Sequence, residues 1–216
     1  MANAITIGRL VLLFVVVWLI YHGSVQVIAL CMLLLILVIA ADGLDGWVAR
    51  KRNETSTFGA VFDIAGDRIV ENVLWIIFAD LGLIPVWVPL LVISRGFIVD
   101  GLRSLSMQEG MTAFGENNMM RSPFTQWLTA GRFMRAFFGY AKALAFVFLC
   151  GLVGWELHDS ANTFIGSLYS QDWYRYVGWA LVWLAVGLTV VRGIPVVIDG
   201  VAYVRDLDRR RKSGSA

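Results

Sequence analysis

The chain has 216 residues, of which 58% are hydrophobic and 16% charged, and its formal net charge is +2. Soluble domains are typically about 45–50% apolar with glycine included and about 25% charged, so this composition excludes an ordinary soluble protein. At about 20 apolar residues per span, the chain can form around six transmembrane helices and no additional soluble domain. We therefore expect an all-α, polytopic membrane protein that forms a single domain over residues 1–216.

Six apolar segments follow one another along the chain, and each is long enough for a membrane-spanning helix. The expected spans cover residues 5–21, 25–48, 58–83, 86–105, 136–155 and 174–197. One long connection remains, at about 107–132, and we expect it to contain a loop and a short interfacial helix.

Cationic residues are distributed unevenly around these segments. One cluster follows the second segment at 50–52, another lies in the tail at 209–212, and most of the others fall between Arg95 and Lys142. With six spans, these groups of cations lie on the side of both termini, and only Arg175 lies near the other side. The positive-inside rule therefore makes the side of the termini cytoplasmic. We therefore expect a bacterial-type inner-membrane protein with a cytoplasmic 107–132 connection and a basic tail, at about 205–216, close to anionic lipid. Because the basic clusters flank apolar segments, we expect no nucleic-acid partner.

Four aspartates lie within or at the cytoplasmic ends of the second and third segments. A carboxylate at the centre of a transmembrane helix costs roughly 2.5–3.5 kcal/mol, so a group of four requires compensation. Asp42 and Asp45 share one helical face, and Asp63 and Asp67 share another. Because a short basic turn joins the two segments, we expect antiparallel neighbouring helices whose carboxylates converge.

A cluster of carboxylate oxygens favours Mg²⁺ or Mn²⁺ over softer ions. Two such ions about 3.5–4 Å apart commonly hold a phosphoryl group during in-line displacement. Gly46 and Gly59 leave room for a ligand close to the backbone, and Arg50 can bind phosphate oxygens. The alternative is that the glycines only allow close helix packing and that the aspartates only pair with cations at the membrane edge, namely Arg50, Lys51, Arg52 and Arg68. Arg68 can also pair with Glu71 or a neighbouring aspartate.

Written out, the segment is D-G-L-D-G-W-V-A-R over 42–50, eight further residues, and G-A-V-F-D-I-A-G-D over 59–67. This sequence, here called the aspartate motif, resembles the D-x-x-D-G-x-x-A-R-x8-G-x-x-x-D-x-x-x-D pattern of the CDP-alcohol phosphotransferases at all eight specified positions. The opening segment from Asn3 to Arg9 is also similar to the start of that family. The resemblance implies six membrane helices, a cytoplasmic active site and a homodimer.

The resemblance further implies transfer of a phosphatidyl group from CDP-diacylglycerol to an alcohol, with release of CMP. Four carboxylates would hold two divalent metal ions, and Asp67 would also act as the general base. The implied metal ligands are Asp42, Asp45, Asp63 and Asp67, the implied cytidine pocket is formed by Gly46, Ala49 and Gly59, and Arg50 would contact the diphosphate.

The acceptor is indicated by cations later in the chain. Arg95 and Arg103 resemble two arginines, eight residues apart, in the fourth helix of phosphatidylglycerophosphate synthases, and Lys142 is similar to the lysine in their fifth helix. These three cations favour a phosphorylated alcohol such as sn-glycerol 3-phosphate. Arg68, after the last aspartate of the motif, and Arg192, in the last segment, resemble residues of the family members that use inositol phosphate. Inositol phosphate is therefore the second candidate acceptor.

Two other classes of protein also place carboxylates in membrane helices. A non-catalytic transporter is one alternative, but it predicts broken helices and a site near the midplane. An aspartate-rich membrane prenyltransferase is another, and it requires more helices and two separated aspartate motifs. The sequence leaves open which metal binds, which alcohol accepts the phosphatidyl group and how many subunits assemble.

Overall fold

The structure is a computed structural model of the chain. It describes the backbone of residues 2–52, 57–108, 120, 122–157, 160 and 162–213, and the side chains of residues 4–41, 59, 61–105, 120, 122–157, 160 and 162–205. Throughout these ranges the regular structure is helical and contains no strand. The all-α prediction is confirmed.

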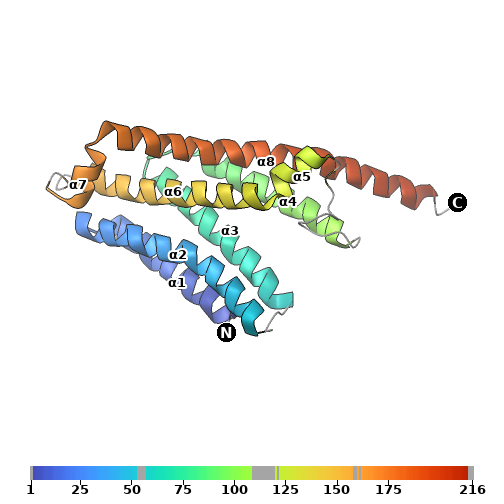
Figure 1. Cartoon of the computed structure of the whole chain (residues 1–216), viewed down its shortest axis with the longest axis horizontal. Helices are drawn as coiled ribbons and strands as arrows, with labels where there is room; N and C mark the ends of the chain where they lie inside the picture. Colours follow the sequence, from blue (N-terminus) through green and yellow to red (C-terminus); the bar gives the residue numbers. More distant parts are fainter. Residues whose placement is uncertain are drawn as a thin grey trace. The chain divides into compact units, whose positions relative to one another are not determined.

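Each of the six predicted segments forms most of one long helix (Figure 1). The helices are α1 (Ala2–His22), α2 (Val25–Arg52), α3 (Thr57–Asp80), α4 (Trp87–Gln108), α5 (Pro123–Ala130), α6 (Arg132–Glu156), α7 (Phe164–Tyr169) and α8 (Asp172–Ser213). The short helix α5 lies in the connection where one was predicted, whereas α7 was not predicted. Helix α8 continues well beyond the expected span, because helical hydrogen bonding does not require apolar side chains.

Three stretches of the described helices are long and apolar enough to cross a membrane. They are Ala4–His22, Pro123–Glu156 and Asp172–Arg205, and a shorter apolar helix covers Val25–Ala41. Helices α3 and α4 carry several charged residues each, which lowers their hydropathy. The apolar helices identify an integral membrane protein, and the number of six spans stays a prediction.

The chain divides into two compact units. The first consists of Met1–Pro89 and Lys142–Val182, and the second of Leu90–Ala141 and Trp183–Ala216. Helices α6 and α8 therefore contribute residues to both units. The single domain expected from the sequence stays a prediction.

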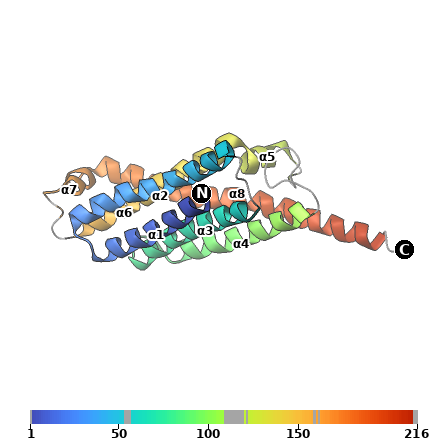
Figure 2. The ribbon, with the colours of Figure 1, turned by 90° about the horizontal axis from the view of Figure 1, so that it is seen from below.

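In the first unit, α1 packs against both α2 and α3 (Figures 1 and 2). Arg9 contacts Asp67 near the start of α1, and the Tyr21 hydroxyl donates to Asp80 at 2.6 Å near its end. The separation between these two contacts along α1 is almost the same as their separation along α3. The two helices are therefore parallel and stay in register between the contacts. The first half of α3 therefore lies beside the start of α1.

Aromatic side chains form much of the core of the first unit. Trp75 and Phe78 of α3 are fully buried and pack against Phe146 of α6, with ring centroids 4.8 Å and 6.3 Å apart. Tyr169 of α7 is also buried, and its hydroxyl donates to the Phe148 carbonyl at 2.7 Å. These contacts hold α3 and α7 against α6.

In the second unit, α4 packs on α8 through Val99 and Val196, with Leu102 and Tyr203 beside them. The start of α5 is capped by Ser122, whose hydroxyl accepts from the Phe124 backbone N–H at 3.3 Å. Such a cap satisfies one of the backbone donors that a helix start leaves without an intrahelical partner.

Candidate active site

The aspartate motif extends across the end of α2 and the start of α3. Helix α2 continues through Arg52, so the two aspartates at 42 and 45 are three residues apart in one helix. The side chains of five motif residues lie outside the described residues, so their convergence stays a prediction. These five are Asp42, Asp45, Gly46, Ala49 and Arg50.

The second half of the motif lies on successive turns of α3. Gly59, Asp63 and Asp67 are four residues apart in one continuous helix, so they follow one face. Asp63 is half-buried, and the side chain of Asp67 is 49% exposed. Asp67 is therefore both accessible to a reactant and anchored in a helix.

Asp67 is held by an arginine from another helix. Nη2 of Arg9 in α1 donates to Oδ1 of Asp67 at 2.9 Å, and the Arg9 side chain is only 2% exposed. A Cβ atom added at Gly66 would lie 2.9 Å from Arg9 Nη2 and 2.9 Å from Thr6 Cγ2. The small residue at 66 thus allows the guanidinium to approach α3.

Arg9 is a candidate functional residue that the aspartate motif does not include, although its position in the sequence carries a signal. An arginine inside an apolar segment must find a partner, because an isolated buried charge is costly. The segment from Asn3 to Arg9 had also been matched to the family's opening sequence. Periodicity identifies the face on which a charge lies but does not identify its partner on another helix.

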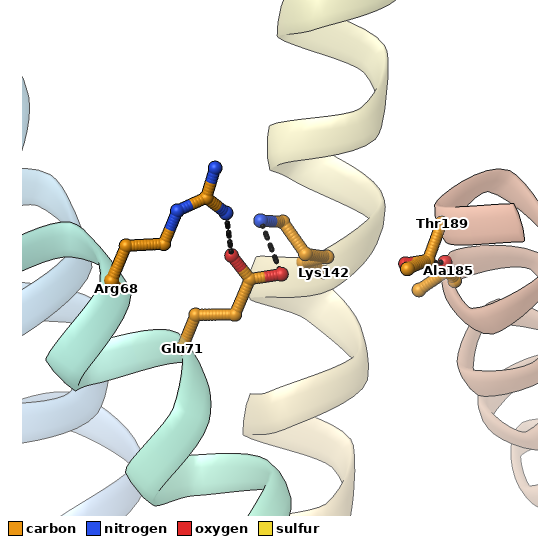
Figure 3. Close-up of polar contacts among 5 residues, drawn as sticks. All are labelled: Arg68, Glu71, Lys142, Ala185 and Thr189. Atoms are coloured by element: carbon orange, nitrogen blue, oxygen red, sulfur yellow. Dashed lines mark hydrogen bonds and ion pairs between the residues drawn. The ribbon is translucent and has the colours of Figure 1, made fainter. Parts of the chain in front are cut away.

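A second group of charges surrounds Glu71, one turn beyond Asp67. Oε2 of Glu71 accepts from Nη1 of Arg68 at 3.3 Å, and Oε1 lies 2.9 Å from Nζ of Lys142 in α6 (Figure 3). The anticipated pairing of Arg68 with Glu71 is confirmed. Lys142, predicted to bind the acceptor, is held by Glu71, a carboxylate outside the predicted site.

The two other cations predicted for the acceptor, Arg95 and Arg103, belong to α4 in the second unit, and both are half-buried. A Cβ atom added at Gly193 of α8 would lie 2.9 Å from Cγ and 3.2 Å from Nε of Arg95. The Arg95 side chain therefore runs close over the α8 backbone. Because Lys142 is described in the first unit, a pocket shared by all three cations stays a prediction.

Arg192 of α8, which resembled the inositol-phosphate branch, binds the end of α5. Its Nε donates to the Leu128 carbonyl at 3.1 Å and its Nη2 to the Thr129 carbonyl at 2.9 Å. Its guanidinium carbon lies 4.8 Å from the ring centroid of Phe138, and the residue is 6% exposed. A cation at the last carbonyls of a helix is favourable, so Arg192 caps α5.

The donor set of the motif fits a hard divalent cation. Both motif aspartates with described side chains offer carboxylate oxygens on one face of α3, and carboxylate oxygens are the preferred ligands of Mg²⁺ and Mn²⁺. Among the described side chains, which exclude the two aspartates of α2, no three His, Cys, Asp or Glu residues form a metal-sized cluster. The two aspartates of α2 stay the predicted further ligands.

Comparison with known proteins identifies the class to which this site belongs. The model of the CDP-alcohol phosphatidyltransferase family matches residues 1–191. The chain therefore belongs to the CDP-alcohol phosphatidyltransferase family, and the resemblance drawn from the aspartate motif is confirmed.

Individual relatives are similar over different parts of the chain. A CDP-diacylglycerol--glycerol-3-phosphate 3-phosphatidyltransferase of Bacillus subtilis is 37% identical over 71 residues, covering 33% of this chain and 37% of that protein. The corresponding protein of Rickettsia typhi is 32% identical over 101 residues, covering 47% and 57%. A putative cardiolipin synthase of Mycobacterium tuberculosis is 28% identical over 203 residues, covering 89% and 85%. The chain thus spans roughly a third to just over half of the two phosphatidyltransferases.

Proposed function

We propose that this protein transfers a phosphatidyl group from CDP-diacylglycerol to sn-glycerol 3-phosphate and releases CMP. The observation that carries this proposal is the aspartate motif, complete at eight positions and located on two consecutive helices. Family membership and the names of the B. subtilis and R. typhi relatives support the same reaction.

In this proposal, the motif residues hold the nucleotide substrate. Asp42, Asp45, Asp63 and Asp67 would hold two Mg²⁺ or Mn²⁺ ions, which neutralise the charge of the diphosphate when bound. The guanidinium of Arg50 binds diphosphate oxygens, because its planar fork matches their geometry. Gly46, Ala49 and Gly59 leave room for the cytidine.

Asp67 acts on the acceptor. Its carboxylate takes the proton of the acceptor hydroxyl while the hydroxyl oxygen attacks the phosphorus that bears diacylglycerol. The bond from that phosphorus to the bridging oxygen breaks, and CMP leaves with the electron pair. Arg9 orients Asp67 through Oδ1 and comes from a different helix, so the position of the base depends on the packing of α1 against α3.

For the remaining architecture, we propose six membrane spans with both termini and the site in the cytoplasm. The six long helices and the cationic clusters at one set of their ends support this topology. A homodimer is proposed from family resemblance alone.

A second candidate acceptor is a lipid alcohol, phosphatidylglycerol, which would make the product a cardiolipin. The observation that favours it is the similarity to the putative cardiolipin synthase, which extends over 89% of this chain. Inositol phosphate loses one of its two supporting residues, because Arg192 donates to the carbonyls of α5, while Arg68 remains.

A head-group screen tests the proposal. Purified protein in detergent receives CDP-diacylglycerol, Mg²⁺ and one acceptor at a time, and release of CMP is measured. We expect release with sn-glycerol 3-phosphate and none with free glycerol. Release only with phosphatidylglycerol would establish the second candidate, and no release with any alcohol would leave a non-catalytic transporter as the better hypothesis.

A further inference from the structure

Glu71 is a buried carboxylate that binds two cations at once. Its side chain is 9% exposed, and it accepts from Arg68 through one oxygen and contacts Lys142 through the other (Figure 3). Burying a carboxylate is costly unless the charge is paired and hydrogen-bonded. The two cations account for the presence of this carboxylate inside the first unit.

The two cations come from different helices and are held together by this one carboxylate. Arg68 belongs to α3 and Lys142 to α6, and both point their nitrogens toward Glu71 (Figure 3). Like charges this close repel each other unless an anion lies between them. Glu71 therefore fixes the spacing of the guanidinium and the ammonium.

Exposure increases outward from the carboxylate. The side chains of Arg68 and Lys142 are 29% and 19% exposed, against 9% for Glu71. Both cations are therefore more accessible than the carboxylate that holds them. The outer side of the cluster is suited to an anion.

The cluster lies at a defined distance from the proposed base. Glu71 is four residues after Asp67 on α3, which corresponds to about one helical turn or 5.4 Å along the axis. A three-carbon alcohol phosphate with its hydroxyl at Asp67 can place its phosphate about one turn away. The spacing matches a small phosphorylated acceptor.

Resting on the function proposed above, we propose that Glu71 is a positioning residue that holds Arg68 and Lys142 as a phosphate-binding pair for the acceptor. Arg68 becomes a second phosphate contact beside Lys142, and the pair favours an acceptor that carries a phosphate monoester. The contacts would be charge-assisted hydrogen bonds, which are shorter and stronger than neutral ones.

The central test is Glu71→Gln. A glutamine amide has no charge and offers one acceptor oxygen in place of two, and its NH₂ group only donates, so the two cations lose the separate oxygens that now hold them. We expect the KM for sn-glycerol 3-phosphate to rise about 10-fold or more, while kcat and the KM for CDP-diacylglycerol change less than about 3-fold. Glu71→Asp keeps the charge and should restore part of the acceptor affinity.

Binding without turnover provides a second measurement. Protection of the protein against thermal unfolding by sn-glycerol 3-phosphate alone should be present in the unchanged protein and weaker in Glu71→Gln. If Glu71→Gln does not fold, Arg68→Gln serves as the test, because it leaves the contact between Glu71 and Lys142 in place. It should also raise the acceptor KM about 10-fold.

Tyr21→Phe is the matched control. It removes a polar contact between α1 and α3 at their other end and leaves the Glu71 cluster intact. Both KM values should remain within about 2-fold of those of the unchanged protein, since the variant loses one hydrogen bond away from the site.

The proposal is overturned if Glu71→Gln keeps or lowers the acceptor KM, or if the KM values for both substrates rise together. An unchanged or lower acceptor KM would mean that the Glu71 carboxylate does not help binding and only repels the acceptor phosphate. A rise in both KM values would mean that Glu71 only supports the fold. Failure of the unchanged protein to release CMP would instead refute the proposed function, so the two failures are distinguishable.

Discussion

The two units of this protein bury arginines in different ways. In the first unit, Arg9 is 2% exposed and donates to the half-exposed carboxylate of Asp67. In the second, Arg192 is 6% exposed, donates to two backbone carbonyls and lies over the ring of Phe138. Residues of one type and of similar burial therefore have partners of different kinds.

The kind of partner separates two roles for an intramembrane arginine. A carboxylate near the surface can exchange partners with a substrate, so the arginine that orients it can affect chemistry. A backbone carbonyl at the end of α5 can change partners only if the helix moves. We infer that Arg9 acts on the reaction through Asp67, whereas Arg192 acts on the position of α5.

The largest expected effect comes from Asp67→Asn. This change keeps the size of the side chain but removes the proposed base and a proposed metal ligand, so turnover should fall by about 10²- to 10⁴-fold or more. CMP release measures it, and the thermal unfolding midpoint shows whether the fold is kept. Turnover near that of the unchanged protein would remove Asp67 from the reaction and with it the functional role of Arg9.

The next effect is expected for Arg9→Ala. Loss of the guanidinium leaves Asp67 in place but without its orientation, and misplacement of a catalytic group by about 1 Å can cost 10²-fold. We expect kcat to fall by roughly 10- to 100-fold, with a smaller change in the KM for CDP-diacylglycerol. Steady-state CMP release separates the two constants, and an unchanged kcat would make Arg9 purely structural.

Arg192→Met should produce the opposite pattern. Its loss leaves the carbonyls of Leu128 and Thr129 without this donor, at a cost of about 2–3 kcal/mol. For a chain of this size, that corresponds to a decrease of about 5–10 °C in the unfolding midpoint. CMP-release kinetics should give an acceptor KM within about 3-fold of normal. A raised KM in a stable variant would make Arg192 an acceptor ligand.

Much of the fold could be predicted because apolar segments of about 20 residues specify membrane helices directly. The ends of the helices were less predictable, as α8 shows by continuing to Ser213 through a basic sequence. Helix α7 was missed because its six residues are too few for a periodic pattern.

The aspartate motif could also be read from the sequence, because its residues lie within two consecutive helices at fixed spacing. The residues that pair with its charged side chains could not be read from the sequence. Arg9 is 58 positions from Asp67, and Lys142 meets Glu71 from another helix. Such pairs depend on helix packing, which a single sequence does not specify. A useful signal was the number of charges in apolar segments, because each of them requires a partner.

The smallest effects, and the sharpest comparison of the two units, come from Gly66→Ala and Gly193→Ala. In both cases the new methyl group meets an arginine at 2.9 Å, Arg9 at its Nη2 atom and Arg95 at its Cγ atom. Alanine favours a helix by up to about 1 kcal/mol over glycine, so neither change should prevent folding. Because 2.9 Å is shorter than a normal contact, the arginine side chain must move in each variant, and at Gly66 the Thr6 side chain, also at 2.9 Å, must move with it. The constant that changes then depends on the function of that arginine. We expect Gly66→Ala to lower kcat by roughly 3- to 10-fold at an unchanged acceptor KM, because it moves the group that orients Asp67. Gly193→Ala should raise the acceptor KM by a similar factor at an unchanged kcat, because Arg95 is proposed to bind the acceptor phosphate. CMP release at varied sn-glycerol 3-phosphate measures both. If the two variants change the same constant, the proposed division between an arginine that orients the base and one that binds the acceptor is wrong.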